Sequence, residues 1–299
     1  IQYIGRFDVS KPDAPRFAWS GSSITARYQA EKVTLLLKDD PRAELTDDSG
    51  ASFRNWFDVL IDGQVILTIV AKPDRTRYEI PCPSGNAPHT ISIFKRTEAV
   101  VGIATFLGFE LSGGGKLLDP PARPDRRIEF IGDSITAGLD VVKVGKLFTL
   151  AAENNRLDYS AVAARRLGAE SICIAYSGSG VHCDGGGGKS NTLPVLYDRI
   201  VPQEPDSRWD FTRWTPQVVV IHLGSNDVGA KVGGNCKDDF QLYIDSYVTF
   251  VARVRKQYPQ AHIFCMIGPV LWHVDLLTKL PSATVETFRK KGDTKVHYL

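Results

Sequence analysis

The chain has 299 residues, 43% of them hydrophobic, and a formal net charge of +2 at pH 7. This length favours two domains over one, and the hydrophobic fraction suffices for ordinary buried cores. The small net charge gives no electrostatic reason to expect a nucleic-acid or membrane partner, and no apolar run approaches the ~20 residues that span a bilayer, so we expect a soluble globular protein.

Residues 1–112 are expected to form an all-β domain. Short alternating segments rich in β-branched and aromatic residues are separated by turn residues, and no helical period of convincing length interrupts them. The Asp62-Gly63 pair between two such segments indicates a hairpin. The simplest architecture is a jelly-roll-like sandwich of two antiparallel sheets. The predicted strands are 24–28, 32–37, 56–61, 65–70, 77–80, 89–95 and 102–111.

Residues 113–127 collect glycine, proline and charge, a composition typical of a linker. Beyond it, in residues 128–299, predicted strands alternate with predicted helices, which indicates a parallel sheet with helices on both faces. The strands are 128–131, 171–175, 218–222, 263–267 and 295–299, and the helices are 159–167, 192–201, 240–257 and 283–291. In such sheets the loops after the strands carry the chemistry.

Three of these loops contain polar groups suited to acyl transfer. The first reads GDS, and a glycine there allows a sharp turn that would present the Ser134 hydroxyl at the sheet edge. The second, YSGSG, contains Gly178, which offers an unobstructed backbone N–H. The third, GSND, contains Asn226, whose neutral amide suits a developing oxyanion. The alternative interpretation makes Asp133 or Ser134 a helix cap, Gly178 a simple turn and Asp227 a cap for the following segment.

The three motifs in this order resemble those of the SGNH (GDSL-like) hydrolases. The resemblance covers residues 127–299. It implies that Ser134 is the nucleophile and that the Ser134 N–H, the Gly178 N–H and the Asn226 amide form the oxyanion hole. It also implies a serine esterase without metal or cofactor.

A β-sandwich directly before an SGNH domain resembles the bimodular acetyl esterases of carbohydrate esterase family two. The segments WSGSSI at 19–24 and IAYSG at 174–178 are similar to parts of that family. The resemblance implies removal of acetyl groups from plant cell-wall polysaccharides such as xylan and glucomannan. Two alternatives remain: an SGNH esterase or lipase acting on non-carbohydrate esters, and a carbohydrate-binding protein without turnover.

The histidine that takes the serine proton in this family follows the last strand in a D-x-H or D-x-x-H segment, and no such segment is visible here. We expect the chain to be truncated, with the base beyond Leu299. His273, after the fourth strand of the second domain, is an alternative base, and His297 is a weaker one. His222 is expected to be a hydrogen-bonded core residue, and His182 to lie near the site.

Five cysteines contain no CxxC pair, which disfavours a metal site. Cys173 and Cys265 lie in apolar strands and are expected to be buried. Cys183 and Cys236 lie in loops at the same end of the sheet, so either a disulfide between them or two free thiols fits the sequence. The start at Ile1 rather than methionine suggests that a leader or tag was removed, and we expect a secreted protein.

Overall fold

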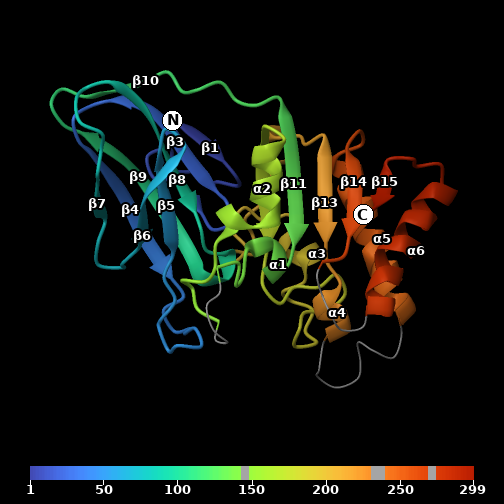
Figure 1. Ribbon diagram of the computed structural model, residues 1–299. Helices are drawn as coiled ribbons and strands as arrows, with labels where there is room; N and C mark the ends of the chain where they lie inside the picture. The colour runs from blue at the N-terminus through green and yellow to red at the C-terminus, as the bar shows by residue number, and fades with distance from the viewer. Residues whose placement is uncertain (143–147, 230–239, 269–273) are drawn as a thin grey trace.

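The computed structural model describes residues 1–142, 148–229, 240–268 and 274–299. Two parts lie side by side: a β-sandwich, drawn mainly in blue and teal, and an α/β domain, drawn from green to red (Figure 1). Within the described ranges, no helix combines the length and apolar character needed to cross a membrane.

The first part consists of two antiparallel sheets that share one core. One sheet has the order β1-β3-β8-β5-β6, with β10 also paired to β3; the other has the order β2-β9-β4-β7. The strands are β1 (Gln2–Ile4), β2 (Arg16–Phe17), β3 (Ser23–Gln29), β4 (Val33–Pro41), β5 (Trp56–Ile61), β6 (Gln64–Val70), β7 (Arg77–Ile80), β8 (Pro88–Lys95), β9 (Gly102–Leu111) and β10 (Lys116–Leu118).

The alternating sequence produces this sandwich because successive side chains of a strand point to opposite faces. Alternate residues of β3 and β4 are buried in the shared core: Ile24, Ala26, Tyr28, Val33, Leu35 and Leu37. The β5–β6 hairpin turns at Asp62 (φ 49°) and Gly63 (φ 81°), the left-handed pair that the Asp-Gly signal predicts. The prediction of an antiparallel β domain is thus confirmed, while its jelly-roll connectivity stays a prediction.

The segment predicted as a linker, 113–127, contains regular structure. Strand β10 pairs antiparallel with β3, and β11 (Arg126–Gly132) begins inside the segment. Arg123 also forms an ion pair with Glu170 of the α/β domain at 2.6 Å. The prediction missed this structure for two reasons. The segment is rich in proline and glycine, and a three-residue strand shows almost no sequence pattern of its own.

The second part is a five-stranded parallel sheet with the order β12-β11-β13-β14-β15. Its other strands are β12 (Ala169–Ala175), β13 (Val218–His222), β14 (His262–Met266) and β15 (Val296–Tyr298). The α-helices are α1 (Ser134–Ala137), α2 (Tyr159–Arg166), α3 (Leu193–Leu196), α4 (Ser225–Gly229), α5 (Phe240–Gln257) and α6 (Val274–Lys290). Short 3-10 turns are η1 (Ala99–Val101), η2 (Asn155–Leu157) and η3 (Phe211–Arg213).

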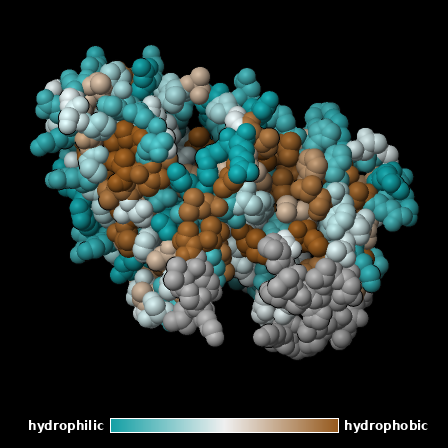
Figure 2. Space-filling view, in the orientation of Figure 1, coloured by the Kyte–Doolittle hydropathy of each residue, from teal (hydrophilic) through white to brown (hydrophobic). Residues whose placement is uncertain are grey.

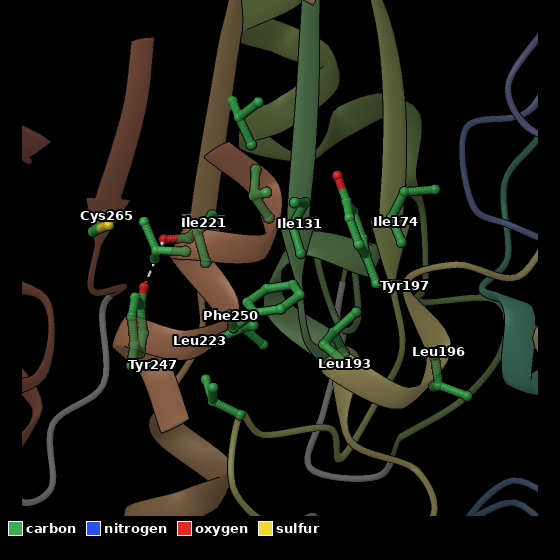
Figure 3. Close-up of a cluster of buried hydrophobic side chains, with 14 of the residues drawn as sticks. Ile131, Ile174, Leu193, Leu196, Tyr197, Ile221, Leu223, Tyr247, Phe250 and Cys265 are labelled. Atoms are coloured by element: carbon green, nitrogen blue, oxygen red, sulfur yellow. Dashed lines mark hydrogen bonds between the residues drawn. The ribbon is translucent and has the colours of Figure 1, made fainter. Parts of the chain in front are cut away.

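Helices cover both faces of this sheet, as predicted. Ile128 and Phe130 of β11 pack with α2 on one face, whereas Ile131 belongs to the larger core on the other face. That core joins residues of α3 and α5 to the sheet, and the hydroxyl of Tyr247 donates a 3.3 Å hydrogen bond to the carbonyl of Ile221 (Figure 3).

Two helices differ from the prediction. Helix α3 covers only Leu193–Leu196 of the expected 192–201, and Pro194 lies in its first turn. Helix α6 begins at Val274 rather than at 283 and continues through Pro281. Because proline in a helix interior removes one backbone hydrogen bond, the sequence predicted a helix that starts after Pro281.

A buried ion pair joins the two parts. Arg6 follows β1, and its guanidinium Nη2 lies 3.2 Å from Oε1 of Glu129 on β11, with both side chains fully buried. Glu129 also accepts a 2.7 Å hydrogen bond from the Tyr197 hydroxyl. The guanidinium stacks over the rings of Tyr197, Trp209 and Phe211 at 5.1, 5.4 and 5.3 Å. An ion pair that is fully shielded from solvent therefore connects the two domains.

The surface is not uniformly polar. Figure 2 shows apolar residues gathered in patches over the sandwich and over the middle of the drawn face. The edge strand β6 contributes to the exposed apolar surface, with Val65, Ile66 and Val70 being 41%, 37% and 39% exposed.

Candidate active site

The three residues predicted to act together follow three neighbouring strands. Ser134 follows β11, Gly178 lies just beyond β12, and Asn226 lies just beyond β13. Because the strands are parallel, these loops share the carboxyl edge of the sheet, where α1 and α4 lie at the lower ends of the arrows (Figure 1).

Ser134 is the first residue of α1 and is half-buried. Asp133 before it is the N-cap, and its Oδ1 accepts a hydrogen bond from the N–H of Ile135 at 3.0 Å. Glycine at position 132 allows Thr136 to pack closely, because a Cβ there would lie 2.0 Å from Oγ1 of Thr136. Capping by Asp133 and presentation of Ser134 are therefore compatible rather than alternative interpretations.

Asp133 links the first loop to the third. Its carboxylate is fully buried, and Oδ2 accepts hydrogen bonds from the hydroxyl of Ser225 and, at 3.3 Å, from Nδ2 of Asn226. Asp133 therefore determines the relative positions of Ser134 and Asn226, a role that the sequence did not reveal.

Asn226 links the third loop to the second. Its Nδ2 donates to the carbonyl of Ser179 at 2.9 Å. Gly178 has a φ of 77°, in the left-handed region that favours glycine, and its carbonyl accepts from the N–H of Gly185 at 2.8 Å. The N–H of Gly178 donates to none of the described residues. The structure thus brings the three loops together and leaves this N–H available.

Asp227 shapes the second loop rather than capping its own helix. Its buried carboxylate accepts hydrogen bonds from the N–H groups of Val181, His182 and Cys183 at 2.7–3.1 Å. Burial raises the pKa of Asp227 to about 6, against these backbone donors, which lower it. A Cβ at Gly180 would lie 2.4 Å from Oδ2 of Asp227, so only glycine allows this close approach.

A second buried carboxylate reaches the same loop from the sandwich. Glu98, between β8 and η1, accepts hydrogen bonds from both the N–H and the hydroxyl of Ser177. Neither Glu98 nor Asp227 was identified from the sequence as part of the site, because their partners lie far away in the chain.

The candidate bases differ in their positions. Nε2 of His297 lies 2.9 Å from Nδ1 of His262, and its ring stacks on Phe264. Since His262 begins β14, this contact points toward the amino edge of the sheet, away from Ser134. Burial and the neighbouring His262 lower the pKa of His297. His273 lies outside the described residues.

His182 and His222 differ in their hydrogen-bond contacts. Nδ1 of His182 lies 2.9 Å from the hydroxyl of Ser246, so the ring packs on α5. His222 is buried, as expected, but its Nδ1 has no hydrogen-bond partner within the described part of the chain, contrary to the expectation of a hydrogen-bonded core residue. Burial lowers the pKa of His222.

The cysteines that the structure describes are in states that the sequence analysis allowed. Cys173 and Cys265 are buried free thiols, and Cys82 is also free. Cys183 is disulfide-bonded, and Cys236 lies outside the described residues.

Family models match both parts of the chain. The model described as carbohydrate esterase 2 N-terminal matches residues 3–121, and that of the GDSL-like lipase/acylhydrolase family matches residues 130–291.

Curated relatives match along the whole chain. The cellulase/esterase CelE of Acetivibrio thermocellus is 35% identical over 305 residues, which cover 100% of this chain and 35% of the relative. This chain therefore spans about a third of the length of CelE. An acetylxylan esterase/glucomannan deacetylase of Cellvibrio japonicus is 26% identical over 301 residues, covering 100% of this chain and 79% of the relative.

Solved structures share the arrangement of both domains. A family two carbohydrate esterase from Clostridium thermocellum, in complex with cellohexaose, superposes with a TM-score of 0.87 at 35% identity, covering 99% of this chain and 87% of that one. A family two enzyme with a carbohydrate-binding domain from Corynascus thermopiles (Myceliophthora fergusii) gives 0.84 at 27% identity, covering 99% and 88%. The chain therefore belongs to the GDSL-like lipase/acylhydrolase family and, across both domains, to the family two carbohydrate esterases.

Proposed function

We propose that this protein is a serine esterase that removes acetyl groups from plant cell-wall polysaccharides such as xylan and glucomannan. The observation that carries the proposal is the convergence of the GDS, SGSG and GSND loops through Asp133 and Asn226 at one sheet edge. The names of the relatives, which include acetylxylan esterase and glucomannan deacetylase, support the substrate class.

In the proposed reaction, Oγ of Ser134 attacks the acetyl carbonyl carbon and forms an ester bond to it. The hydroxyl proton passes to a histidine base and then to the sugar oxygen as the bond from that oxygen to the carbonyl carbon breaks. Water attacks the acyl-enzyme, the same base takes a proton from it, and acetate leaves while Ser134 regains its proton.

The negative charge on the carbonyl oxygen is stabilised by the N–H groups of Ser134 and Gly178 and by the amide of Asn226. The N–H of Gly178 is available for this purpose. Asn226 directs its weaker hydrogen bond, 3.3 Å, to Asp133. When Asn226 redirects this N–H to the oxyanion, the carboxylate of Asp133 still accepts a hydrogen bond from the Ser225 hydroxyl. No buried carboxylate oxygen is then left without a donor.

The general base is a histidine that the described residues do not identify. His297 contacts His262 and His182 contacts Ser246, and His273 lies outside the described residues. We also propose that the protein is secreted. The disulfide at Cys183 supports an oxidising compartment.

The test compares the unmodified protein, as the cell makes it, with Ser134→Ala. We expect the unmodified protein to hydrolyse 4-nitrophenyl acetate and to release acetate from acetylated xylan or glucomannan, and Ser134→Ala to lose both activities. Full hydrolysis by Ser134→Ala would refute the assignment. A preference for long acyl chains would favour a lipase, and oligosaccharide binding without acetate release would favour a non-catalytic binding protein.

A further inference from the structure

Glu98 of the sandwich reaches the loop that carries Gly178. The side chain is 1% exposed. Its Oε2 accepts a hydrogen bond from the N–H of Ser177 at 2.8 Å, and Oε1 accepts one from the Ser177 hydroxyl. One carboxylate from the first domain thus satisfies both donors of a residue 79 positions later in the second.

The backbone of Glu98 is held on both sides. Its N–H donates to the carboxylate of Glu153, and its carbonyl accepts a hydrogen bond from Nζ of Lys95 at 2.9 Å. Lys95 also donates to the carbonyl of Thr97 at 2.7 Å. A residue whose N–H and C=O are both bonded has little freedom to turn, so the backbone of Glu98 is held by Lys95 of the sandwich and by Glu153 of the α/β domain.

Burial of the charged groups of Glu98, Glu153 and Lys95 is energetically costly. Desolvation raises the pKa of Glu98 and of Glu153 and lowers the pKa of Lys95 to about 8. The hydrogen bonds from Ser177 oppose the shift at Glu98 because they favour its charged form. A buried carboxylate with two donors from one residue therefore orders that residue strongly.

Ser177 directly precedes Gly178, and the peptide group between them contains the Gly178 N–H. On the other side of this peptide, the Ser179 N–H donates to the carbonyl of Tyr176 at 3.1 Å, and the Gly185 N–H donates to the carbonyl of Gly178. On the Ser177 side of this peptide, the two hydrogen bonds from Ser177 to Glu98 hold the backbone. With Ser177 anchored, little rotation is left that could turn the Gly178 N–H away from the site.

We propose that Glu98 is a positioning residue through which the sandwich orients the oxyanion-binding N–H of Gly178. The inference rests on the proposed esterase function. It assigns the sandwich a part in turnover, in addition to any contact that it makes with sugar.

The experiment measures kcat and KM of Glu98→Ala with 4-nitrophenyl acetate. We expect kcat to fall about 10–100-fold and KM to change less than about twofold, because a misplaced donor weakens only the transition state. The rate at which an organophosphate labels Ser134 should fall in parallel. Glu98→Gln, whose amide can accept from the N–H and donate to the hydroxyl of Ser177, should restore kcat to within about threefold.

Glu170→Ala is the matched control. Glu170 is also a buried glutamate, lies at the opposite end of β12, and hydrogen-bonds Arg123 and Trp214 rather than the site. It should lower stability without lowering kcat of the folded protein. If Glu98→Ala fails to fold, Ser177→Ala, which removes one of the two donors, should lower kcat about threefold to tenfold with unchanged KM.

The outcomes separate the two proposals. Turnover by Ser134→Ala would overturn the esterase mechanism whatever Glu98 does. If Ser134→Ala is inactive while folded Glu98→Ala or Ser177→Ala keeps the kcat of the unmodified protein, or if Glu98→Gln fails to recover it, the role assigned to Glu98 is wrong.

Discussion

Arg6→Met should destabilise the protein more than the loss of an ordinary surface charge. Both Arg6 and Glu129 are fully buried, and their charged atoms lie 3.2 Å apart. Methionine fills much of the same space but leaves the Glu129 carboxylate without its cation, and it leaves the carbonyls of Tyr197 and Arg199 without their donor.

Breaking a buried pair in this way costs about 3–5 kcal/mol in free energy of unfolding. The double variant Arg6→Met/Glu129→Leu removes both charges and should recover about 1–4 kcal/mol of that loss. It leaves the Tyr197 hydroxyl without its 2.7 Å acceptor, so recovery should be incomplete.

The loss should also depend on pH. Burial raises the pKa of Glu129, and Arg6 opposes that shift. Without Arg6 the folded-state pKa rises further, so the folded protein takes up a proton that the unfolded chain binds only at lower pH. Stability of Arg6→Met should therefore increase, relative to the unmodified protein, as the pH falls from 7 toward the pKa of an unfolded glutamate.

Urea denaturation at pH 7 and pH 5 measures these differences through the midpoint and slope. The reasoning would be refuted if Arg6→Met lost less than about 1 kcal/mol, or if the double variant were no more stable than the single one.

Two further predictions concern the loops of the site. Asn226→Ala should lower kcat about 10²–10³-fold while the fold is retained, since Asp133 keeps the donors Ser225 and Ile135; steady-state kinetics and circular dichroism check this, and a kcat within a factor of two would contradict it. Gly180→Ala should lower the free energy of unfolding by about 3 kcal/mol or more, measured by thermal unfolding, because its Cβ would lie 2.1 Å from the carbonyl of Cys183. The control Gly63→Ala meets no atom within 4 Å and should cost only the left-handed backbone penalty of about 1–2 kcal/mol; equal effects would contradict the steric argument.

Much of the fold was predictable because its strands either bury alternate residues or consist of apolar runs. The bounds of β5, β7, β9, β13 and α5 agree with the predicted segments. Strands β1, β2 and β10 were not predicted, since two or three residues carry no detectable period and depend on a partner strand for their hydrogen bonds.

The site divides in the same way. Ser134, Gly178 and Asn226 could be located because each follows an apolar strand, and parallel strands end at one edge. The carboxylates that orient these residues could not, since Glu98 is 79 positions from Ser177 and Asp227 is 44 positions from Cys183. No local pattern records such pairings.

The pairing of β3 has a consequence for synthesis of the chain. Strand β1 pairs with residues 23–25 of β3, and β10 pairs with residues 27–29, so two short strands from opposite ends of the sandwich lie end to end along one edge. Half of that edge stays uncovered until residues 116–118 have left the ribosome. An unpaired strand edge readily binds other strands. A nascent chain from which residues 116–118 have not yet emerged is thus exposed to misassembly, and a longer chain that has released them is protected.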